Sequence, residues 1–203
     1  MSPDGEGMHA LKTLVLGGAR SGKSAHGEQL VPGHEHGPVT YVATARPWPG
    51  DQDFSRRIAA HVARRPHWWD TEDRIDAVEL LHDPPRGTIL VDDLGTWLTH
   101  TIDRAQAWDA APATAPREAV SRRCDALVAA VSSCPPDRRL ILISPEVGMS
   151  VIPEHPSGRY FRDTLGALNA AIASVCERVQ LVVAGCALDL KPPAGGAPPQ
   201  PGC

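Results

Sequence analysis

Residues 13–24 read TLVLGGARSGKS, and the last eight fit the pattern G-x-x-x-x-G-K-[ST]. The spacing predicts a loop that wraps phosphate, because glycines let successive backbone N–H groups face an anion without Cβ clashes. We expect Lys23 to neutralise β- and γ-phosphate oxygens and the Ser24 hydroxyl to ligate Mg²⁺. The predicted nucleotide-binding residues of this loop are Gly17, Gly18, Ala19, Arg20, Ser21, Gly22, Lys23 and Ser24.

An acidic partner for the metal follows a second apolar run, where residues 88–93 read TILVDD. Ligands of open α/β sheets lie at the carboxyl ends of the strands. Asp92 is therefore expected to hold Mg²⁺ directly or through water. Asp93 either shares that role or caps a helix that starts near Gly95.

Apolar runs without polar alternation recur along the chain, as expected for strands of a parallel sheet covered on both faces. The segments between them show helical character, so we predict an α/β fold of the P-loop NTPase type. It is a doubly wound, mainly parallel sheet with helices on both faces. The predicted strands are residues 13–16, 39–43, 88–91, 140–143 and 179–184, and the predicted helices are residues 22–30, 53–65, 73–82, 116–133 and 159–176.

Length and composition restrict the class of protein further. A chain of 203 residues predicts one domain, residues 1–191, followed by a disordered Pro/Gly-rich tail, residues 192–203. The net charge of −4 and 4% aromatic residues disfavour nucleic acid as a partner. The polar N-terminal stretch, the lack of a long apolar segment and five scattered cysteines predict a cytoplasmic protein with no membrane span.

Five blocks occur in order along the chain: GGARSGKS at 17–24, YVATA at 41–45, D-x-D-F-x-x-R-I-x-x-H at 51–61, EVGMSVIP at 146–153 and RYFRDTLGALN at 159–169. Together they resemble the CobU/CobP family, and the resemblance runs from about Leu14 to Lys191. That family comprises bifunctional adenosylcobinamide kinases and adenosylcobinamide-phosphate guanylyltransferases of cobalamin (vitamin B12) synthesis.

The resemblance implies two reactions. ATP or GTP phosphorylates adenosylcobinamide, and GTP then guanylylates a histidine that passes GMP to the phosphorylated cobinamide. His61 matches that histidine, and a neutral imidazole suits the role because it is nucleophilic near pH 7. His61 and Lys23 are thus the predicted catalytic residues. The resemblance also implies that the chain forms a homotrimer.

Further nucleotide contacts are implied by the same resemblance. They are Ala43, Thr44, Ala45, Val62, Ala63, Arg64, Arg65 and an acidic residue, either Glu72 or Asp73. We favour Glu72, whose carboxylate suits guanine N1 and N2; alternatively, it complements a helix N-terminus. Asp92 matches the family's acidic residue at a strand end, although residues 93–96 read DLGT where the family has a Cys-Leu-Thr-like segment.

Two other classes of function compete with this interpretation. One is a P-loop small-molecule kinase without nucleotidyl transfer, in which His61 is inert. The other is a GTP-dependent switch, which normally requires an N-K-x-D segment to select guanine; none of the three lysines, Lys12, Lys23 and Lys191, lies in one. The choice between ATP and GTP as the kinase donor stays open.

Overall fold

The computed structural model describes residues 11–45 and 65–192. Seven strands form one sheet in the order β3-β2-β4-β5-β1-β6-β7, with the first strand of the chain near its centre. All neighbours are parallel except β6 and β7. The strands are β1 (Lys12–Gly17), β2 (Val39–Ala43), β3 (Trp69–Glu72), β4 (Thr88–Asp92), β5 (Arg139–Pro145), β6 (Arg178–Val183) and β7 (Cys186–Lys191).

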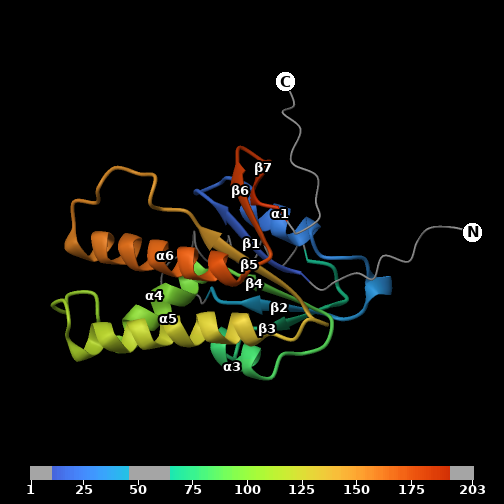
Figure 1. Ribbon diagram of the computed structural model, residues 1–203, viewed down its shortest axis with the longest axis horizontal. Helices are drawn as coiled ribbons and strands as arrows, with labels where there is room; N and C mark the ends of the chain where they lie inside the picture. Colours follow the sequence, from blue (N-terminus) through green and yellow to red (C-terminus); the bar gives the residue numbers. More distant parts are fainter. Residues whose placement is uncertain (1–10, 46–64, 193–203) are drawn as a thin grey trace, which may run out of the picture.

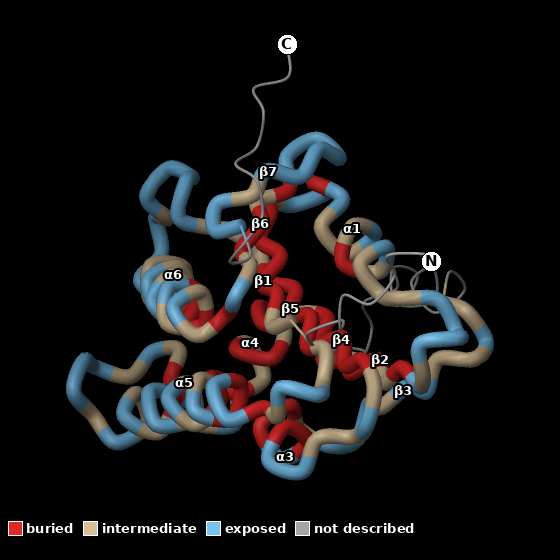
Figure 2. Tube along the Cα trace, turned by 45° about the vertical axis from the view of Figure 1, so that its right-hand side comes forward, coloured by how far each residue is buried: buried red, intermediate tan, exposed pale blue. Residues whose placement is uncertain are grey.

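Helices cover both faces of the sheet (Figures 1 and 2). The face opposite α1 carries α3, α4, α5 and α6, and the predicted doubly wound arrangement is confirmed. The helices are α1 (Lys23–Gln29), α3 (Ala77–His82), α4 (Leu94–Ala105), α5 (Ala115–Ser133) and α6 (Pro156–Val175), with a 3-10 turn, η1 (His34–His36). No helix in residues 11–45 and 65–192 is long and apolar enough to cross a membrane.

The continuous apolar runs arise because both faces of each central strand are buried. Leu14 packs in the large cluster beneath α3–α6, whereas its neighbour Val15 packs in a smaller cluster on the α1 side. Ile89 and Leu90 divide between the same two clusters. Successive side chains of a strand point to opposite faces, so a strand between two helical layers must be apolar at every position.

Two strands lie outside the predicted set. β3 is short, and its sequence, WDTE, lacks the apolar run that predicts β1, β2, β4, β5 and β6. β7 follows β6 through a tight turn in which Ala184 and Gly185 both have positive φ, 51° and 81°. Two such residues are typical of a type I′ hairpin. The predicted strand over 179–184 therefore stops at the turn and misses the antiparallel edge strand.

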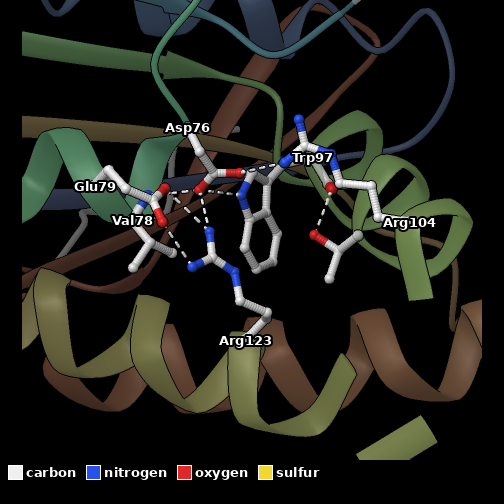
Figure 3. A network of polar contacts seen from close by, with 7 residues as sticks. Asp76, Val78, Glu79, Trp97, Arg104 and Arg123 are labelled. Atoms are coloured by element: carbon white, nitrogen blue, oxygen red, sulfur yellow. Dashed lines mark hydrogen bonds and ion pairs between the residues drawn. The ribbon is translucent and has the colours of Figure 1, made fainter. Parts of the chain in front are cut away.

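The start of α3 differs from the prediction, which placed it at Asp73. Asp76 caps the helix by accepting a hydrogen bond from the Val78 N–H at 2.9 Å, and the helix begins at Ala77. The same carboxylate accepts hydrogen bonds from Trp97 Nε1 at 3.2 Å and from Arg123 Nη2 at 2.7 Å (Figure 3). Arg123 also pairs with Glu79 at 2.8 Å. One capping residue thus connects α3 with α4 and α5.

Candidate functional site

The carboxyl ends of four parallel strands meet at one edge of the sheet. Gly17 of β1 lies beside Pro145 of β5, and Ala43 of β2 lies beside Asp92 of β4. The backbone N–H of Glu146 donates to the Gly17 carbonyl at 3.0 Å, which fixes the start of the loop after β5 against the start of the loop after β1. This edge is where open α/β sheets place their ligands.

The segment 17–24 forms a tight loop between β1 and α1. Arg20 and Gly22 have positive φ, 57° and 93°, and the Ser21 N–H donates to the Gly18 carbonyl at 3.3 Å. Gly17 has no room for a side chain, since a Cβ there would lie 2.8 Å from the Val182 carbonyl oxygen and would also meet Ser21 Oγ. Ser21 is buried, while Ala19 and Arg20 are exposed at the top of the loop.

The hairpin turn after β6 supports this loop, a contact that the sequence interpretation missed. The Gly185 N–H donates to the Ser21 carbonyl at 2.8 Å. A Cβ on Gly22 would lie 3.5 Å from the Gly185 Cα, so the two backbones run close together. Only Gly185 signals this turn in the sequence, because type I′ hairpins usually have Asn, Asp or Gly where Ala184 stands.

Ser24 and Asp92 come together below the loop. The Ser24 hydroxyl donates to Asp92 Oδ1 at 3.3 Å, and Asp92 is buried. A hydroxyl and a carboxylate are hard oxygen ligands, and Mg²⁺ is typically held by one or two such groups together with substrate phosphates. The described residues contain no cluster of three or more His, Cys, Asp or Glu suited to a metal. The pair therefore fits a nucleotide-bound Mg²⁺ better than a closed protein metal site.

The other oxygen of Asp92 is engaged by a buried phenol. Tyr41 donates its hydroxyl hydrogen to Asp92 Oδ2 at 2.7 Å. Burial, and then the neighbouring Asp92 charge, raise the pKa of Tyr41 far above its usual range, so the phenol stays protonated and donates. The guanidinium of Arg65 lies 3.5 Å from the centre of the Tyr41 ring and reaches Thr71 Oγ1 at 3.4 Å.

Asp93 caps α4, in agreement with one of its two interpretations. Its Oδ1 accepts a hydrogen bond from the Thr96 N–H at 2.8 Å. Burial, followed by the adjacent Asp92 charge, raises the pKa of Asp93. Gly95 lets the first turn of α4 approach β5, because a Cβ there would lie 2.5 Å from Pro145 Cγ. Residues 93–96, DLGT, therefore cap α4 and allow it to pack closely against β5 at this strand end.

Thr44 joins the end of β2 to the same turn. Its N–H donates to the Asp92 carbonyl at 3.2 Å, and its hydroxyl donates to the Asp93 carbonyl at 2.7 Å. The predicted contacts Ala43, Thr44 and Ala45 thus lie beside Asp92, and Thr44 is the one whose side chain fixes the acidic turn. Whether these residues touch a nucleotide stays a prediction.

Glu72 lies at the end of β3, with its carboxylate turned to the backbone that follows. Oε1 accepts hydrogen bonds from the Arg74 N–H at 2.7 Å and the Ile75 N–H at 2.9 Å. These bonds, with that from Ile75 contributing most to the shift, lower the pKa of Glu72. Glu72 is not at a helix N-terminus, because α3 starts at Ala77. If this carboxylate bound guanine, it would do so while also accepting the hydrogen bonds of the turn.

Four predicted site residues, His61, Val62, Ala63 and Arg64, lie outside the described residues. Among the described ones, the structure brings together the loop 17–24, Asp92, Thr44 and Arg65, with Glu72 at the next strand end. The functions of Tyr41 and Thr96 were not identified from sequence, since nothing in the strand or helix pattern shows which long-range partner a hydroxyl has.

A phosphate-binding loop, a buried acid opposite its serine and a mainly parallel sheet define a P-loop nucleotide-binding protein. In fold the chain is similar to an ATPase from the type III secretion system of pathogenic bacteria, with a TM-score of 0.53 at 10% identity. The match covers 85% of this chain, which spans about half (51%) of the ATPase. This likeness concerns the fold alone.

Sequence comparison gives the family. Residues 13–190 match the model of the cobinamide kinase / cobinamide phosphate guanyltransferase family, CobU, and the chain belongs to that family. It is 38% identical to the bifunctional adenosylcobalamin biosynthesis protein CobP of Pseudomonas aeruginosa, over 89% of this chain and 98% of the relative. It is 34% identical to the bifunctional adenosylcobalamin biosynthesis protein CobU of Escherichia coli, over 88% of this chain and 98% of that relative. The protein is therefore a transferase of cobalamin biosynthesis with cobinamide kinase and guanyltransferase activity by family.

Proposed function

We propose that this one sheet edge carries out both reactions: phosphorylation of adenosylcobinamide by ATP or GTP, then transfer of GMP from GTP to the product. The observation that carries the proposal is the Ser24–Asp92 pair below the phosphate loop of a chain in this family. A single triphosphate cradle serves both steps, since either reaction needs the same charged groups aligned at its phosphates.

In the kinase step the acceptor hydroxyl oxygen attacks the γ-phosphorus. The bond from that phosphorus to the β–γ bridging oxygen breaks, the nucleoside diphosphate leaves and the hydroxyl proton passes to solvent. Lys23 offsets charge on the β- and γ-oxygens, and residues 17–22 hold the phosphates through backbone N–H groups. Ser24 and Asp92 would hold Mg²⁺, which when bound would neutralise part of the phosphate charge.

In the guanylyl step an imidazole nitrogen of His61 attacks the α-phosphorus of GTP. A P–N bond forms, the α–β phosphoanhydride bond breaks and pyrophosphate leaves. A phosphate oxygen of the phosphorylated cobinamide then attacks the same phosphorus, the P–N bond breaks and adenosyl-GDP-cobinamide forms. Val62, Ala63, Arg64 and Arg65 contact the nucleotide, the arginines offsetting phosphate charge. Glu72 selects guanine, and Ala43, Thr44 and Ala45 line the strand end.

We further propose that the chain works as a homotrimer in the cytoplasm. The homotrimer rests on the resemblance to the CobU/CobP family alone. Four described cysteines, Cys124, Cys134, Cys176 and Cys186, are free thiols, which supports a reducing compartment. One domain over residues 1–191 and a disordered tail over 192–203 complete the proposal.

Intact-protein mass spectrometry after incubation with GTP and Mg²⁺ tests the guanylyl step. We expect a mass gain of one GMP, located on His61 by peptide mapping. The gain should be absent in His61→Ala and present in His67→Ala, a control at an exposed histidine nearby. Lack of any adduct in the wild type, with phosphorylation of adenosylcobinamide intact, would leave a P-loop kinase without nucleotidyl transfer.

The Lys23→Ala variant tests whether both reactions use one triphosphate-binding site or two independent sites. If one triphosphate site serves both reactions, this substitution removes phosphorylation and guanylylation together, whereas His61→Ala removes only guanylylation. Retention of either activity in Lys23→Ala contradicts the shared site.

A further inference from the structure

The two carboxylate oxygens of Asp92 have different described partners. Oδ1 accepts from Ser24 and faces the proposed Mg²⁺ position, while Oδ2 accepts from Tyr41. A carboxylate with one oxygen fixed from behind presents the other in a defined direction. Groups that orient a metal-holding residue in this way commonly change metal affinity tenfold or more when they are lost.

Tyr41 reaches Asp92 from the neighbouring strand, within the core. It lies opposite Leu90 of β4, two residues before the Ala43–Asp92 pair, so its long side chain crosses diagonally to the strand end. It belongs to the buried apolar cluster on the α1 side, its ring stacks with that of Trp69 at 6.2 Å between centroids, and only 2% of the residue is exposed. The phenol is therefore held in one place before any ligand arrives.

Arg65 connects the ring to the segment that bears the predicted nucleophile. Its guanidinium is 3.5 Å from the centre of the Tyr41 ring, and Arg65 follows His61 by four residues in the chain. A cation over a phenol ring strengthens the hydroxyl as a donor and adds an attraction of its own. Three successive contacts thus connect the end of that segment with the phosphate loop: Arg65 with Tyr41, Tyr41 with Asp92, and Asp92 with Ser24.

We propose that Tyr41 is a positioning residue that orients Asp92 for Mg²⁺, and that Arg65 acts on the metal position through the Tyr41 hydroxyl. The proposal rests on the proposed use of a Mg²⁺-nucleotide by this loop. Neither residue needs to touch the metal or the reacting phosphorus for this role. Loss of the hydroxyl weakens the metal's contribution to nucleotide binding and leaves the metal-free interaction with the loop in place.

The test measures binding of α,β-methylene GTP, which cannot donate GMP, as a function of Mg²⁺ concentration. Tyr41→Phe keeps the ring and removes the hydroxyl. We expect the Mg²⁺ concentration for half-maximal binding to rise about tenfold, the usual effect of losing one hydrogen bond to a charged group. Affinity without Mg²⁺ stays within about twofold of wild type, which also shows that the variant is folded.

Tyr160→Phe is the matched control. Tyr160 also lies under an arginine, Arg117, at 4.0 Å, but on the helical layer formed by α5 and α6. Its Mg²⁺ midpoint should equal that of wild type. An unchanged midpoint in Tyr41→Phe, or equal losses with and without Mg²⁺, would overturn the positioning role.

A double-mutant cycle tests the part assigned to Arg65. Arg65→Met keeps an apolar cover over the ring and removes the charge. It should raise the Mg²⁺ midpoint more in the wild-type background than in Tyr41→Phe, whereas a direct contact of Arg65 with the nucleotide would lower the affinity equally in both backgrounds. Equal effects in both backgrounds would show that Arg65 acts without Tyr41. Because this nucleotide cannot guanylylate the enzyme, the outcome is independent of whether His61 forms an adduct, and failure of the proposed guanylylation would be detected separately.

Discussion

The Gly185 N–H donates a 2.8 Å hydrogen bond to the carbonyl of Ser21, so the turn of an edge hairpin lies directly behind the phosphate loop. β6 also lies beside β1, and the Val182 carbonyl bounds the space next to Gly17. The loop is therefore enclosed by β6 and its turn as well as by its own backbone. This makes its shape dependent on residues about 160 positions away in the chain.

Gly185→Val should weaken nucleotide binding. Gly185 has φ of 81°, which a β-branched residue adopts only with strain, so the turn is expected to change and release Ser21. We expect nucleotide affinity to fall about tenfold, the loss of roughly one well-placed hydrogen bond. Gly37→Val is the control, because Gly37 also has positive φ, 108°, but precedes β2, which is the second strand from the opposite edge of the sheet. It should lower the melting temperature and leave nucleotide affinity unchanged.

Gly17→Ala should abolish nucleotide binding in a protein that still folds. The new Cβ would lie 2.8 Å from the Val182 carbonyl oxygen, and backbone there cannot move without disturbing β6. Isothermal titration with GTP measures the loss, and circular dichroism checks the fold. Gly166→Ala in α6 has open space for its Cβ and should be neutral or stabilising by up to about 1 kcal/mol. Normal GTP binding by Gly17→Ala would contradict the tight loop.

Glu72→Gln separates guanine selection from turn formation. Glutamine can still accept hydrogen bonds from the Arg74 and Ile75 N–H groups, but it cannot accept two from guanine N1 and N2. If Glu72 selects guanine, the preference for GTP over ATP falls roughly tenfold, since a bidentate base contact contributes ~1–3 kcal/mol. The melting temperature should change little. A parallel loss of GTP and ATP binding would instead assign Glu72 to the turn alone.

The Arg123–Glu79 pair predicts a dependence of stability on pH. The hydrogen bond from Arg123 lowers the pKa of Glu79 from 4.5 to about 2 in the folded chain. A folded pKa below the unfolded one gives stability that is complete above pH 4.5 and is lost as the pH falls toward 2. Glu79 is largely exposed, so Arg123→Ala should cost only about 1 kcal/mol at pH 7.

Urea unfolding of wild type and Arg123→Ala at several pH values measures this effect. The difference in unfolding free energy should be constant from pH 7 to 5 and shrink between pH 4.5 and 2. Arg122→Ala, which removes only an i,i+4 pair with Glu118 at 3.8 Å, is the control. A difference that does not change down to pH 2 would show that Arg123 stabilises the fold through packing and not through its ion pairs.

The sequence by itself determined the fold class, the phosphate loop and the strand-end acid. These are local signals: the loop needs glycines, lysine and serine in consecutive order, and a strand buried on both faces needs an unbroken apolar run. The predicted strands at 13–16, 88–91 and 140–143, each with at least three consecutive apolar residues, are all present within β1, β4 and β5. The capping role of Asp93 could also be predicted locally, because the residue lies three positions before Thr96, whose N–H donates to its carboxylate.

Tertiary structure decided the contacts that depend on side chains or turns distant in the chain. Tyr41 resembles any buried strand residue in the sequence, and only the register of β2 against β4 brings its hydroxyl to Asp92. The Gly185 turn supports the phosphate loop only because β6 pairs with β1. β3 and α3 were misjudged because a polar edge strand lacks an apolar run and because Asp76, not Asp73, caps the helix. Periodicity shows which residues are buried, whereas strand order and register determine which buried residues meet.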